Sequence, residues 1–569
     1  MRAVDATLAC LKRAGVNAIF GLPGGPVIPL FDALFDDPDI RTFLVRHEQG
    51  AGHMAEGYAK VTGRAGVCTA TSGPGATNLV TPIADAYMDS VPLVAITGQV
   101  GSTRVGTDAF QEADIVGITL PIVKHSYLVK DAEELPRVLT EALWVAQSGR
   151  PGPVLVDVCV DQWGRDVVDY EGPTRPEMPG YRPPETAGHP RQLAAAARVL
   201  AAAERPMIYA GGGIIAGGAH EELTRLAETT GIPVTTTLMG LGGFPGSHPL
   251  YVGMPGMHGI AASTFAFQAS DAILAVGVRF DERVLSTVMS EWAPGAKIIH
   301  IDVDPAEISK NRGAHIGIAG QAAPALGALA DAYAALPERH DPDRRAAWVA
   351  QIAEWKREHP YHVDTEGEIQ PQDVIQALYR LTRGQAIVCT DVGQHQMWAA
   401  QHYAFDRPRR WITSGGLGTM GFGLPAAIGA QVALPDELVI DIAGDGSFEM
   451  TLQELSTAQT YGLPVKVIIL NNGYLGMVRQ WQELFWQGRY AGTSFEPFQP
   501  DFARLAAAYG VAGQTVRAAG DLEDALREAL AHDGPALVDV HVNPVAKVFP
   551  MVPQGKGPDA MIVGGTGRG

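Results

Sequence analysis

The chain is poor in cysteine. Only four cysteines occur among its 569 residues, and Cys10, Cys68, Cys159 and Cys389 stand far apart in the sequence. No CxxC pair is present, so the pattern supports neither a zinc knuckle nor a disulfide framework. We therefore expect a protein of a reducing compartment, the cytoplasm.

Basic charge is scarce as well, and long apolar runs are missing. The sequence has 43 Lys and Arg against 62 Asp and Glu, a formal net charge of −19. Nucleic acids and anionic membrane surfaces need clustered Lys and Arg, so neither is an expected partner. The longest uncharged stretch, between Arg410 and Asp436, is interrupted by glycines and Pro425. This favours a buried, cofactor-lining segment over a transmembrane helix.

What is present is typical of a globular protein rich in turns. Hydrophobic residues make up 46% and charged residues 18% of the chain, and 66 glycines and 40 prolines imply many tight turns. Residues 1–21 mix charges into an apolar pattern, which predicts an amphipathic helix rather than a signal peptide. The length is too great for one hydrophobic core and indicates three or four domains.

Short β-branched runs alternate with longer helical patterns, which predicts an α/β protein with parallel sheets. The clearest predicted strands are residues 67–70, 93–97, 154–158, 207–209, 298–301, 439–442 and 465–470. Residues 171–190 are rich in proline and predict an extended linker, and a charged stretch at 338–368 predicts a second boundary. The predicted domains are 1–170, 190–335 and 365–550.

The first and third of these blocks contain similar βαβ patterns. In one, a strand is followed by SGPGATN at 72–78; in the other, a strand is followed by GDGSFEM at 444–450. Gly73 to Gly98 and Gly446 to Asn471 both span 25 residues. Because βαβ units often have this length, the spacing alone does not identify a site. The different side chains at the two turns favour two halves of one ligand site at the carboxyl ends of the strands.

The strongest chemical signal is Asp445 together with Asn472. Asp445 follows the apolar run VIDIAG, and Asn472 ends the next predicted strand. Both side chains should leave the same edge of a parallel sheet, where a carboxylate and an amide oxygen suit a magnesium ion held against a diphosphate. Either residue alone is also a common turn residue.

At this point the chain resembles the thiamine diphosphate (ThDP) enzymes, whose metal–diphosphate motif is GDG followed by NN. Further segments are similar to the acetolactate synthase (acetohydroxyacid synthase) family: RHEQGAGHMAEGYA, TSGPGATN, ITGQV, GTDAFQEAD, SGRPGPVLVDV, TSGGLGTMGFGLPAAIGA, NNGYLGMVRQWQ and VFPMVPQGKG. The resemblance covers nearly the whole chain. It implies three doubly wound parallel-sheet domains: pyrimidine-binding, central Rossmann-like of the FAD type, and diphosphate-binding.

Glu48 is the residue that the resemblance assigns to cofactor activation. It follows TFLVRH and precedes a predicted helix, where a carboxylate can be largely buried. In the family, the matching Glu hydrogen-bonds the pyrimidine nitrogen of ThDP, so that the 4′-amino group can remove the thiazolium proton. The alternative from the residues alone is a charge that favours a helix start. Glu56, further along the helix, is expected at the surface or in helix packing.

The resemblance assigns the other active-site roles residue by residue. Besides Glu48, the catalytic group includes Gln111 and Met420, a bulky apolar residue expected under the bent cofactor, although Met420 alone would read as core packing. Tyr474 would offer its carbonyl to the metal beside Asp445 and Asn472. Contacts to the cofactor are expected from Pro74, Asn78, Val392, Gly393, Gln394, His395, Gly418, Gly444, Gly446, Ser447, Gly476, Met477 and Val478.

The middle block contains AGGGIIAGG at 210–218, a weak GxGxxA match to a dinucleotide-binding turn. By resemblance, FAD-binding residues are Gly211, Gly212, Gly213, Met257, His258, Gly259, Arg279 and Asp302. The alternative is a Rossmann-like spacer without flavin.

Substrate contacts are assigned to Phe110, Arg283 and Trp481. Arg283 suits a 2-ketoacid carboxylate through two parallel hydrogen bonds. Trp481 lies in an aromatic stretch that also suits a mobile lid.

The implied reaction joins two 2-ketoacids with loss of carbon dioxide, giving 2-acetolactate or 2-aceto-2-hydroxybutyrate. Implied partners are a second copy of the chain, as a homodimer or homotetramer, and a small regulatory subunit. Cys159–Val160 replaces the usual Pro-Lys, and Pro26, Glu282 and Gln321 also depart from the family pattern. The alternatives are a pyruvate oxidase, another ThDP lyase or decarboxylase, and a catalytically silent homologue.

Overall fold

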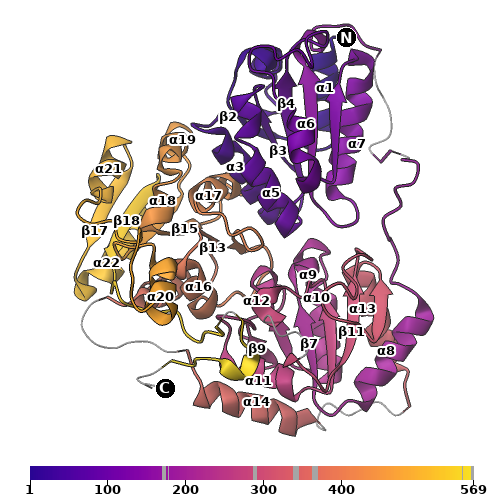
Figure 1. Ribbon diagram of the computed structural model, residues 1–569, viewed down its shortest axis with the longest axis vertical. Helices are drawn as coiled ribbons and strands as arrows, with labels where there is room; N and C mark the ends of the chain where they lie inside the picture. Colours follow the sequence, from indigo (N-terminus) through magenta and orange to yellow (C-terminus); the bar gives the residue numbers. More distant parts are fainter. Residues whose placement is uncertain are drawn as a thin grey trace. The chain divides into compact units, whose positions relative to one another are not determined.

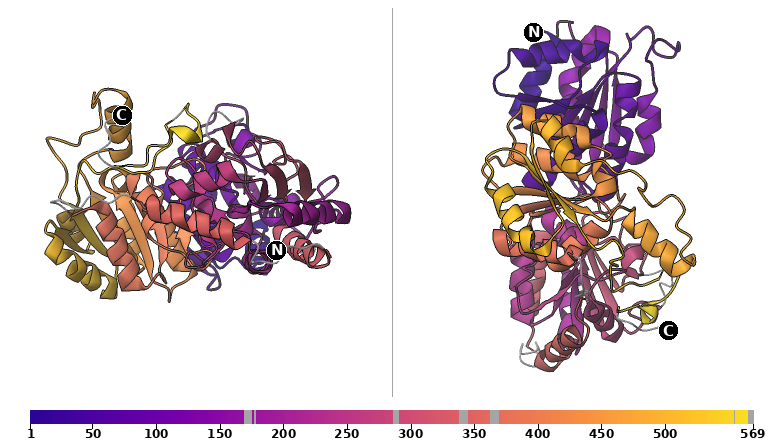
Figure 2. Two further views of the ribbon diagram at one scale, coloured as in Figure 1. Left: turned by 90° about the horizontal axis from the view of Figure 1, so that it is seen from below. Right: turned by 90° about the vertical axis from the view of Figure 1, so that its left-hand side faces the viewer.

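The computed structural model describes residues 1–168, 175–176, 178–285, 291–337, 345–361, 369–553 and 555–564. The described residues form three six-stranded sheets, with helices between most consecutive strands (Figure 1). The strands pair in parallel within each sheet, as the alternation of short apolar runs and helical segments predicts. The predicted α/β fold class is confirmed. Two further views show helices on either side of the strands (Figure 2).

The first sheet has the strand order β2-β1-β3-β4-β6-β5. Its strands are β1 (Ala18–Gly21), β2 (Arg41–Leu44), β3 (Gly66–Ala70), β4 (Leu93–Gln99), β5 (His125–Val129) and β6 (Pro153–Cys159). Its helices are α1 (Ala3–Arg13), α2 (Ile28–Phe35), α3 (Glu48–Thr62), α4 (Pro74–Thr77), α5 (Val80–Asp89), α6 (Ile115–Thr119) and α7 (Leu135–Gln147). Helix α1 confirms the predicted amphipathic N-terminal helix.

The second sheet has the order β12-β11-β10-β7-β8-β9. Its strands are β7 (Pro206–Ala210), β8 (Val234–Thr236), β9 (Tyr251–Gly253), β10 (Ala272–Val276), β11 (Lys297–Asp302) and β12 (Ile316–Ala319). The helices of this part are α8 (Pro190–Ala202), α9 (Gly212–Ala216), α10 (His220–Thr230), α11 (Ala261–Ala269), α12 (Glu282–Leu285), α13 (Ala322–Ala334), α14 (Ala346–Glu358) and α15 (Pro371–Thr382).

The third sheet has the order β14-β13-β15-β16-β18-β17. Its strands are β13 (Ile387–Thr390), β14 (Trp411–Ile412), β15 (Val439–Gly444), β16 (Lys466–Asn471), β17 (Ala512–Val516) and β18 (Ala536–His541). Its helices are α16 (Gln394–His402), α17 (Gly423–Ala433), α18 (Asp445–Phe448), the 3₁₀ turn η8 (Leu452–Glu454), α19 (Leu455–Thr460), α20 (Gly476–Phe485), α21 (Phe502–Ala508) and α22 (Leu522–Ala531).

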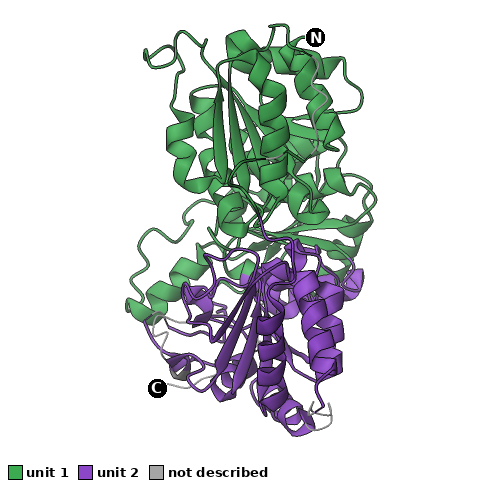
Figure 3. Cartoon of the chain, turned by 90° about the vertical axis from the view of Figure 1, so that its right-hand side faces the viewer, with its two compact units in different colours: residues 1–182, 386–396, 412–544 green, residues 183–385, 397–411, 545–569 purple. Residues whose placement is uncertain are grey.

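These sheets fall into two compact units (Figure 3). The first unit holds the first and most of the third sheet, in residues 1–182, 386–396 and 412–544. The second unit holds the central sheet, in residues 183–385, 397–411 and 545–569. In the second unit, separate apolar clusters cover the two faces of the sheet, so apolar side chains from its strands are buried on both faces.

All seven predicted strands are present, with bounds that differ by a residue or two. Residues 338–344 and 362–368 of the predicted second boundary lie outside the described residues. The charged stretch at 338–368 contains helix α14, and its Trp348 and Ile352 are buried in the apolar cluster of the second unit. Trp355 of the same helix packs on this cluster as well and is partly buried, so one apolar face attaches α14 to the second unit. Of the predicted linker, residues 171–174 and 177 lie outside the described residues, and the rest has no regular element before α8.

Helices α3 and α17 pack against each other and join the first and third sheets into one hydrophobic core (Figure 1). Helix α3 begins after His47, whose side chain accepts a hydrogen bond from the Gln49 N–H at 3.1 Å. The helices cross at glycines: a Cβ on Gly57 would collide with the Ala426 backbone, and one on Gly429 with the Met54 carbonyl. The close approach therefore depends on the missing side chains.

We expect Gly429→Ala to lower the midpoint of thermal unfolding by about 2–5 °C, because overpacking a core contact costs about 1–3 kcal/mol. Differential scanning fluorimetry measures this midpoint. Gly520→Ala is the matched control, since a Cβ there meets no atom within 4 Å. Equal midpoints for the two variants would contradict the close crossing of α3 and α17.

Candidate active site

Glu48 is the first residue of α3, and only 7% of its surface is exposed. The Asn78 side-chain amide donates to Glu48 Oε2 at 2.9 Å. A Cβ on Gly75 would lie 3.2 Å from Glu48 Oε1, so the TSGPGATN turn lies directly against this carboxylate. The structure thus brings together Glu48 and Asn78, which were predicted separately, while Pro74 at the start of α4 is exposed.

Gln111 lies next to the same turn. A Cβ on Gly73 would come within 2.8 Å of the Gln111 carbonyl oxygen. Gln111 has a φ of 61°, a strained value for a residue with a side chain. The preceding Phe110 is 87% exposed, and the loop is closed by Glu112, whose carboxylate accepts hydrogen bonds from the Gly106, Thr107 and Ala109 N–H groups. A residue of the segment GTDAFQEAD thus closes the loop that the segment forms, a role of Glu112 that was not predicted from the sequence.

Glu56 is fully buried, so of the two expectations for it, helix packing holds and exposure at the surface is wrong. Its Oε1 lies 2.9 Å from His53 Nδ1, and His53 Nδ1 lies 4.0 Å from Asp85 Oδ2. Burial raises the pKa of Glu56 well above its usual value, and burial raises the pKa of Asp85 to about 8. These groups lie among α3 and α5, and Asp85 also accepts from Ser414 Oγ at 2.8 Å. The positions of His53, Glu56 and Asp85 in the sequence do not indicate that the three side chains lie together.

Asp445 and Asn472 emerge at the carboxyl ends of the neighbouring parallel strands β15 and β16. Each residue stands one position beyond its strand, and Asp445 is the first residue of α18. Asp445 Oδ2 accepts from the Gly473 N–H and from the Gln499 side chain, both at 2.8 Å. Asn472 Oδ1 accepts from the Tyr474 N–H at 3.0 Å. Gln499 was not predicted; no recognisable motif surrounds it.

Gln394 and His395 belong to the same cluster. Gln394 accepts from Asn472 Nδ2 at 3.3 Å and donates to Gln480 Oε1 at 2.9 Å. A Cβ on Gly444 would lie 2.7 Å from His395 Nδ1. His395 Nε2 is buried without a hydrogen-bond partner among the described residues. Burial lowers the pKa of His395 to about 3, so the ring is neutral.

The loop that carries Met420 lies beside this cluster in the first unit. The Gly421 N–H donates to Asp391 Oδ1 at 2.7 Å, and a Cβ on Gly418 would lie 3.9 Å from Val392. Met420 itself is partly buried. Gly444 and Ser447 exchange hydrogen bonds at 3.2 and 3.1 Å. The remaining predicted residues of this unit are Gly393 and Gly446, both partly buried, and Gly476, Met477, Val478 and Trp481 on α20, where Val478 is 50% exposed.

In the second unit, Gly211 lies between β7 and α9, and Gly212 and Gly213 are the first residues of α9. The Gly213 N–H donates to the Gly277 carbonyl at 3.1 Å, and a Cβ on Gly213 would lie 2.6 Å from Gly277 Cα. A Cβ on Gly211 would collide with the same backbone. Close packing against Gly277 thus explains why residues 211 and 213 are glycines, but it does not explain Gly212. The GxGxxA match is therefore not by itself a sign of a dinucleotide.

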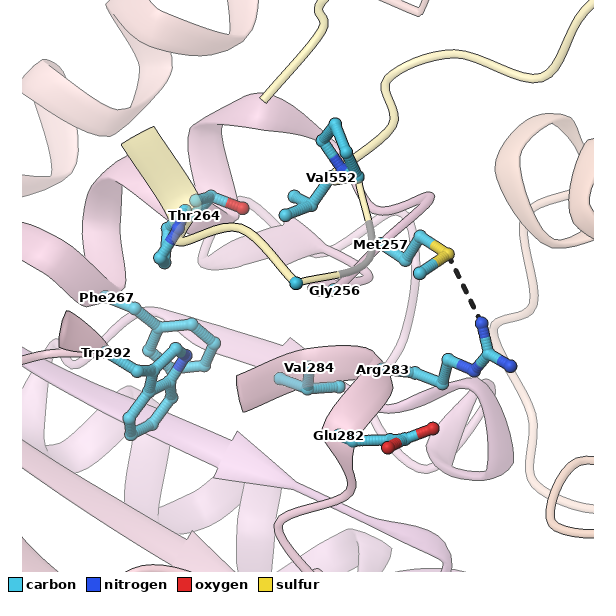
Figure 4. A pocket seen from close by; sticks show the side chains of 12 residues that line it. Gly256, Met257, Thr264, Phe267, Glu282, Arg283, Val284, Trp292 and Val552 are labelled. Carbon is cyan, nitrogen blue, oxygen red and sulfur yellow. Dashed lines mark hydrogen bonds between the residues drawn. The ribbon is translucent and has the colours of Figure 1, made fainter. Parts of the chain in front are cut away.

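A pocket of the second unit contains two of its predicted residues, Met257 and Arg283 (Figure 4). The Arg283 guanidinium approaches Met257 Sδ at 3.5 Å, and the Met257 N–H donates to the Arg283 carbonyl at 2.6 Å. Trp292 and the C-terminal residues Val552 and Pro553 also line it. Gly259 lies tightly against Met254 and Pro255.

Asp302 and Arg279 lie at the carboxyl end of the central sheet. Asp302 ends β11 and is 8% exposed. Its Oδ1 accepts from the Asp304 N–H at 2.8 Å, which holds the turn after the strand. The Arg279 carbonyl accepts from the Asn311 side chain at 3.0 Å. Both residues therefore have structural contacts besides any ligand.

His258 anchors the C-terminal segment in the second unit. Its Nδ1 lies 3.2 Å from the Pro550 carbonyl, so this nitrogen carries the proton and donates. Gln401 donates to the carbonyls of His258 and Phe549 at 2.8 and 3.2 Å. Burial lowers the pKa of His258 to about 4.

This neutral imidazole makes the protein sensitive to acid. Between pH 6.5 and 4 the unfolded His258 binds a proton that the folded one does not, so its stabilising contribution is complete above pH 6.5 and falls with pH. Relative to His258→Gln, which keeps an N–H donor, we expect the wild type to lose about 2 kcal/mol of stability between pH 7 and pH 5. Urea unfolding at the two pH values measures this, and a constant difference would contradict the prediction.

Comparison of the sequence with known protein families identifies the class to which the chain belongs. Residues 1–118 match the thiamine pyrophosphate enzyme N-terminal TPP binding domain, residues 193–329 the central domain, and residues 391–540 the C-terminal TPP binding domain. The two clusters described above, around Glu48 and around Asp445, fall in the two TPP binding domains. The chain is thus a thiamine pyrophosphate enzyme.

Its relatives narrow the class further. It is 50% identical over 563 residues to the acetolactate synthase of Mycobacterium bovis, covering 98% of this chain and 90% of that protein. It is 48% identical over 559 residues to the acetolactate synthase isozyme 3 large subunit of Escherichia coli, covering 97% of each. The large subunit of Corynebacterium glutamicum is 48% identical over 561 residues, with 98% and 89% covered. The chain belongs to the acetolactate synthase family.

No helix in the described part of the chain is both long and apolar enough to cross a membrane. All four cysteines are buried as free thiols, in agreement with the absence of a predicted disulfide framework.

Proposed function

We propose that this chain is the catalytic subunit of an acetolactate synthase that decarboxylates pyruvate and joins the two-carbon unit to a second 2-ketoacid. One observation supports the proposal above all: the chain has a buried carboxylate suited to activate the cofactor and a pair of residues suited to hold its metal-bound diphosphate. Buried Glu48 is oriented by Asn78, and Asp445 and Asn472 stand at one edge of the third sheet.

The C-terminal cluster fits the diphosphate end of thiamine diphosphate. His395 Nε2 is a buried ring nitrogen without a partner among the described residues, and a phosphate group would provide one. Asp445, Asn472 and the Tyr474 carbonyl form a set of hard oxygen ligands that suits Mg²⁺. Val392, Gly393, Gln394, Gly444, Gly446 and Ser447 would contact the diphosphate, and Gly418, Gly476, Met477 and Val478 would line the remaining wall.

Thiamine diphosphate, when bound, supplies the carbon nucleophile that adds to the ketoacid carbonyl and retains the electron pair left by departing carbon dioxide. Glu48 would hold a proton between its carboxyl group and the pyrimidine nitrogen, with Asn78 fixing the orientation of the carboxyl group. Met420 would support the bent cofactor, and Pro74 and Gln111 would bound the same site.

For substrate recognition we propose Phe110, Arg283 and Trp481. Arg283 is an exposed guanidinium on α12 and would bind a 2-ketoacid carboxylate. Phe110 and Trp481 offer apolar surface for the alkyl group of the acceptor. The Trp481 indole N–H is buried without a partner among the described residues, so a bound polar group would satisfy it.

We further propose FAD as a structural cofactor of the second unit, bound by the glycines at 211–213, Met257, His258, Gly259, Arg279 and Asp302. The pocket beside Met257 and the carboxylate at the end of β11 support this. The purified protein should then absorb near 450 nm. We also keep the division into domains 1–170, 190–335 and 365–550.

As partners we propose a second copy of this chain and a small regulatory subunit, in the cytoplasm. The relatives named large subunits support the regulatory partner. Each site would combine the Glu48 cluster of one protomer with the Asp445 cluster of another.

The test is incubation of the protein with pyruvate, thiamine diphosphate, Mg²⁺ and FAD, followed by assays for acetolactate, acetaldehyde and oxygen uptake. Acetolactate without oxygen uptake supports the proposal. Acetaldehyde as the main product would indicate a decarboxylase, and oxygen consumption matching pyruvate loss would indicate an oxidase; either result would overturn it.

A further inference from the structure

The loop between β2 and α3 determines where Glu48 stands, and a residue of the C-terminal TPP binding domain holds this loop. The Glu454 Oε1 atom accepts hydrogen bonds from the Arg46 and His47 N–H groups, both at 3.0 Å. Its Oε2 accepts from Thr457 Oγ1 at 2.6 Å and lies 3.3 Å from the Arg46 N–H. The two backbone donors immediately precede Glu48.

The Glu454 carboxylate can reach this backbone because the residue facing it on α3 is a glycine. It is fully buried, and its neighbour across the contact is Gly50, in the first turn of α3. A Cβ on Gly50 would lie 2.7 Å from Glu454 Oε1. The absent side chain at position 50 therefore admits the carboxylate to the N-terminal turn of α3, where a negative charge is stabilised by the free N–H groups.

Other contacts hold the same loop from outside. The Arg46 guanidinium donates to Ser456 Oγ at 3.1 Å and to Thr460 Oγ1 at 3.2 Å, and the Leu44 N–H donates to the Tyr461 hydroxyl at 2.8 Å. Thr460 and Tyr461 are exposed and Ser456 is partly buried, whereas the Glu454 side chain is fully buried and contacts the backbone next to Glu48.

We propose that Glu454 is a positioning residue for Glu48: by accepting the Arg46 and His47 N–H groups, it fixes the backbone from which the activating carboxylate projects. This inference rests on the proposed function and adds a residue from the C-terminal domain to the activation step. Glu454 lies just beyond Asp445 in the chain, so the segment that follows the metal motif also places Glu48 of the same chain.

The variants are Glu454→Gln, which weakens the acceptor without changing its size, and Gly50→Ala, which displaces the carboxylate without removing it. Ser456→Ala is the matched control, since it removes one contact to the Arg46 side chain and leaves the backbone contacts. The readout is hydrogen–deuterium exchange at the reactive thiazolium carbon of bound thiamine diphosphate, by acid quench and NMR. Cofactor affinity and the unfolding midpoint of the cofactor-free protein are measured in parallel.

We expect both variants to slow the exchange at least about 10-fold, with cofactor affinity within about 3-fold of wild type, and Ser456→Ala to leave it within about 2-fold. If the wild type itself does not accelerate the exchange over free cofactor, the proposed function fails. If the wild type does and Gly50→Ala or Glu454→Gln, folded and loaded, exchanges at the wild-type rate, the positioning role is overturned. Should Glu454→Gln not fold, Gly50→Ala decides alone.

Discussion

Replacing Glu48 by Gln is expected to lower kcat for acetolactate formation by about 10²–10³-fold while thiamine diphosphate still binds. An amide cannot hold the proton that a carboxyl group exchanges with the pyrimidine nitrogen, and loss of a positioned acid–base group costs about this much. The side chain keeps its size and can still meet Asn78, which donates to Oε2 in the wild type. Steady-state kinetics and a binding titration with the cofactor measure the two effects separately.

Glu56→Gln is the matched control for this experiment. Glu56 lies on the same helix and is fully buried, and burial raises its pKa well above the usual value. An amide of the same shape should leave kcat within about 3-fold of the wild type. Turnover by Glu48→Gln at the wild-type rate would refute the assignment of Glu48, and a large loss in Glu56→Gln alone would move the activating role to Glu56.

The second large effect is expected for Asp445→Asn. Removing the carboxylate leaves neutral ligands for Mg²⁺, so we expect affinity for the cofactor–metal pair to fall at least about 100-fold. A ligand at about 100 times its Kd stabilises a protein by about 2.7 kcal/mol, and a variant with a 100-fold higher Kd should lose most of this gain at the same concentration. The shift of the thermal unfolding midpoint on adding thiamine diphosphate and Mg²⁺ is the measurement.

Asp501→Asn is the control for Asp445→Asn. Asp501 caps α21 by accepting the Arg504 N–H at 3.0 Å, and Asn is an equally good cap, so the fold and the ligand response should persist. An unchanged ligand shift in Asp445→Asn would show that the GDG motif does not hold the metal.

Much of the fold was predictable because it depends on local patterns. Short apolar runs such as 439–442 are buried on both faces of a parallel sheet, so they are recognisable without any tertiary contact. Helix α14 was missed because the stretch around it is charged, although Trp348, Ile352 and Trp355 have the spacing of one helix face and pack on one apolar cluster.

The site residues also divide into those that a local pattern predicts and those that only the folded structure reveals. Asp445 and Asn472 could be paired from sequence because neighbouring parallel strands end at one edge, which is a rule of topology. Gln499, which contacts Asp445, stands in no recognisable pattern, and Glu112 lies within GTDAFQEAD, where nothing in the sequence shows that it closes the loop of Phe110.

The amino-acid sequence by itself determined the class of fold, the family and the residue types available for chemistry, since these follow from periodicity and from motifs that are contiguous in the chain. Only the tertiary structure decided which distant groups meet. The contact of Glu454 with the backbone before Glu48, and the crossing of α3 and α17 at Gly57 and Gly429, join residues hundreds of positions apart. Such contacts depend on how whole helices and sheets pack, and packing is a property of surfaces that no single segment contains.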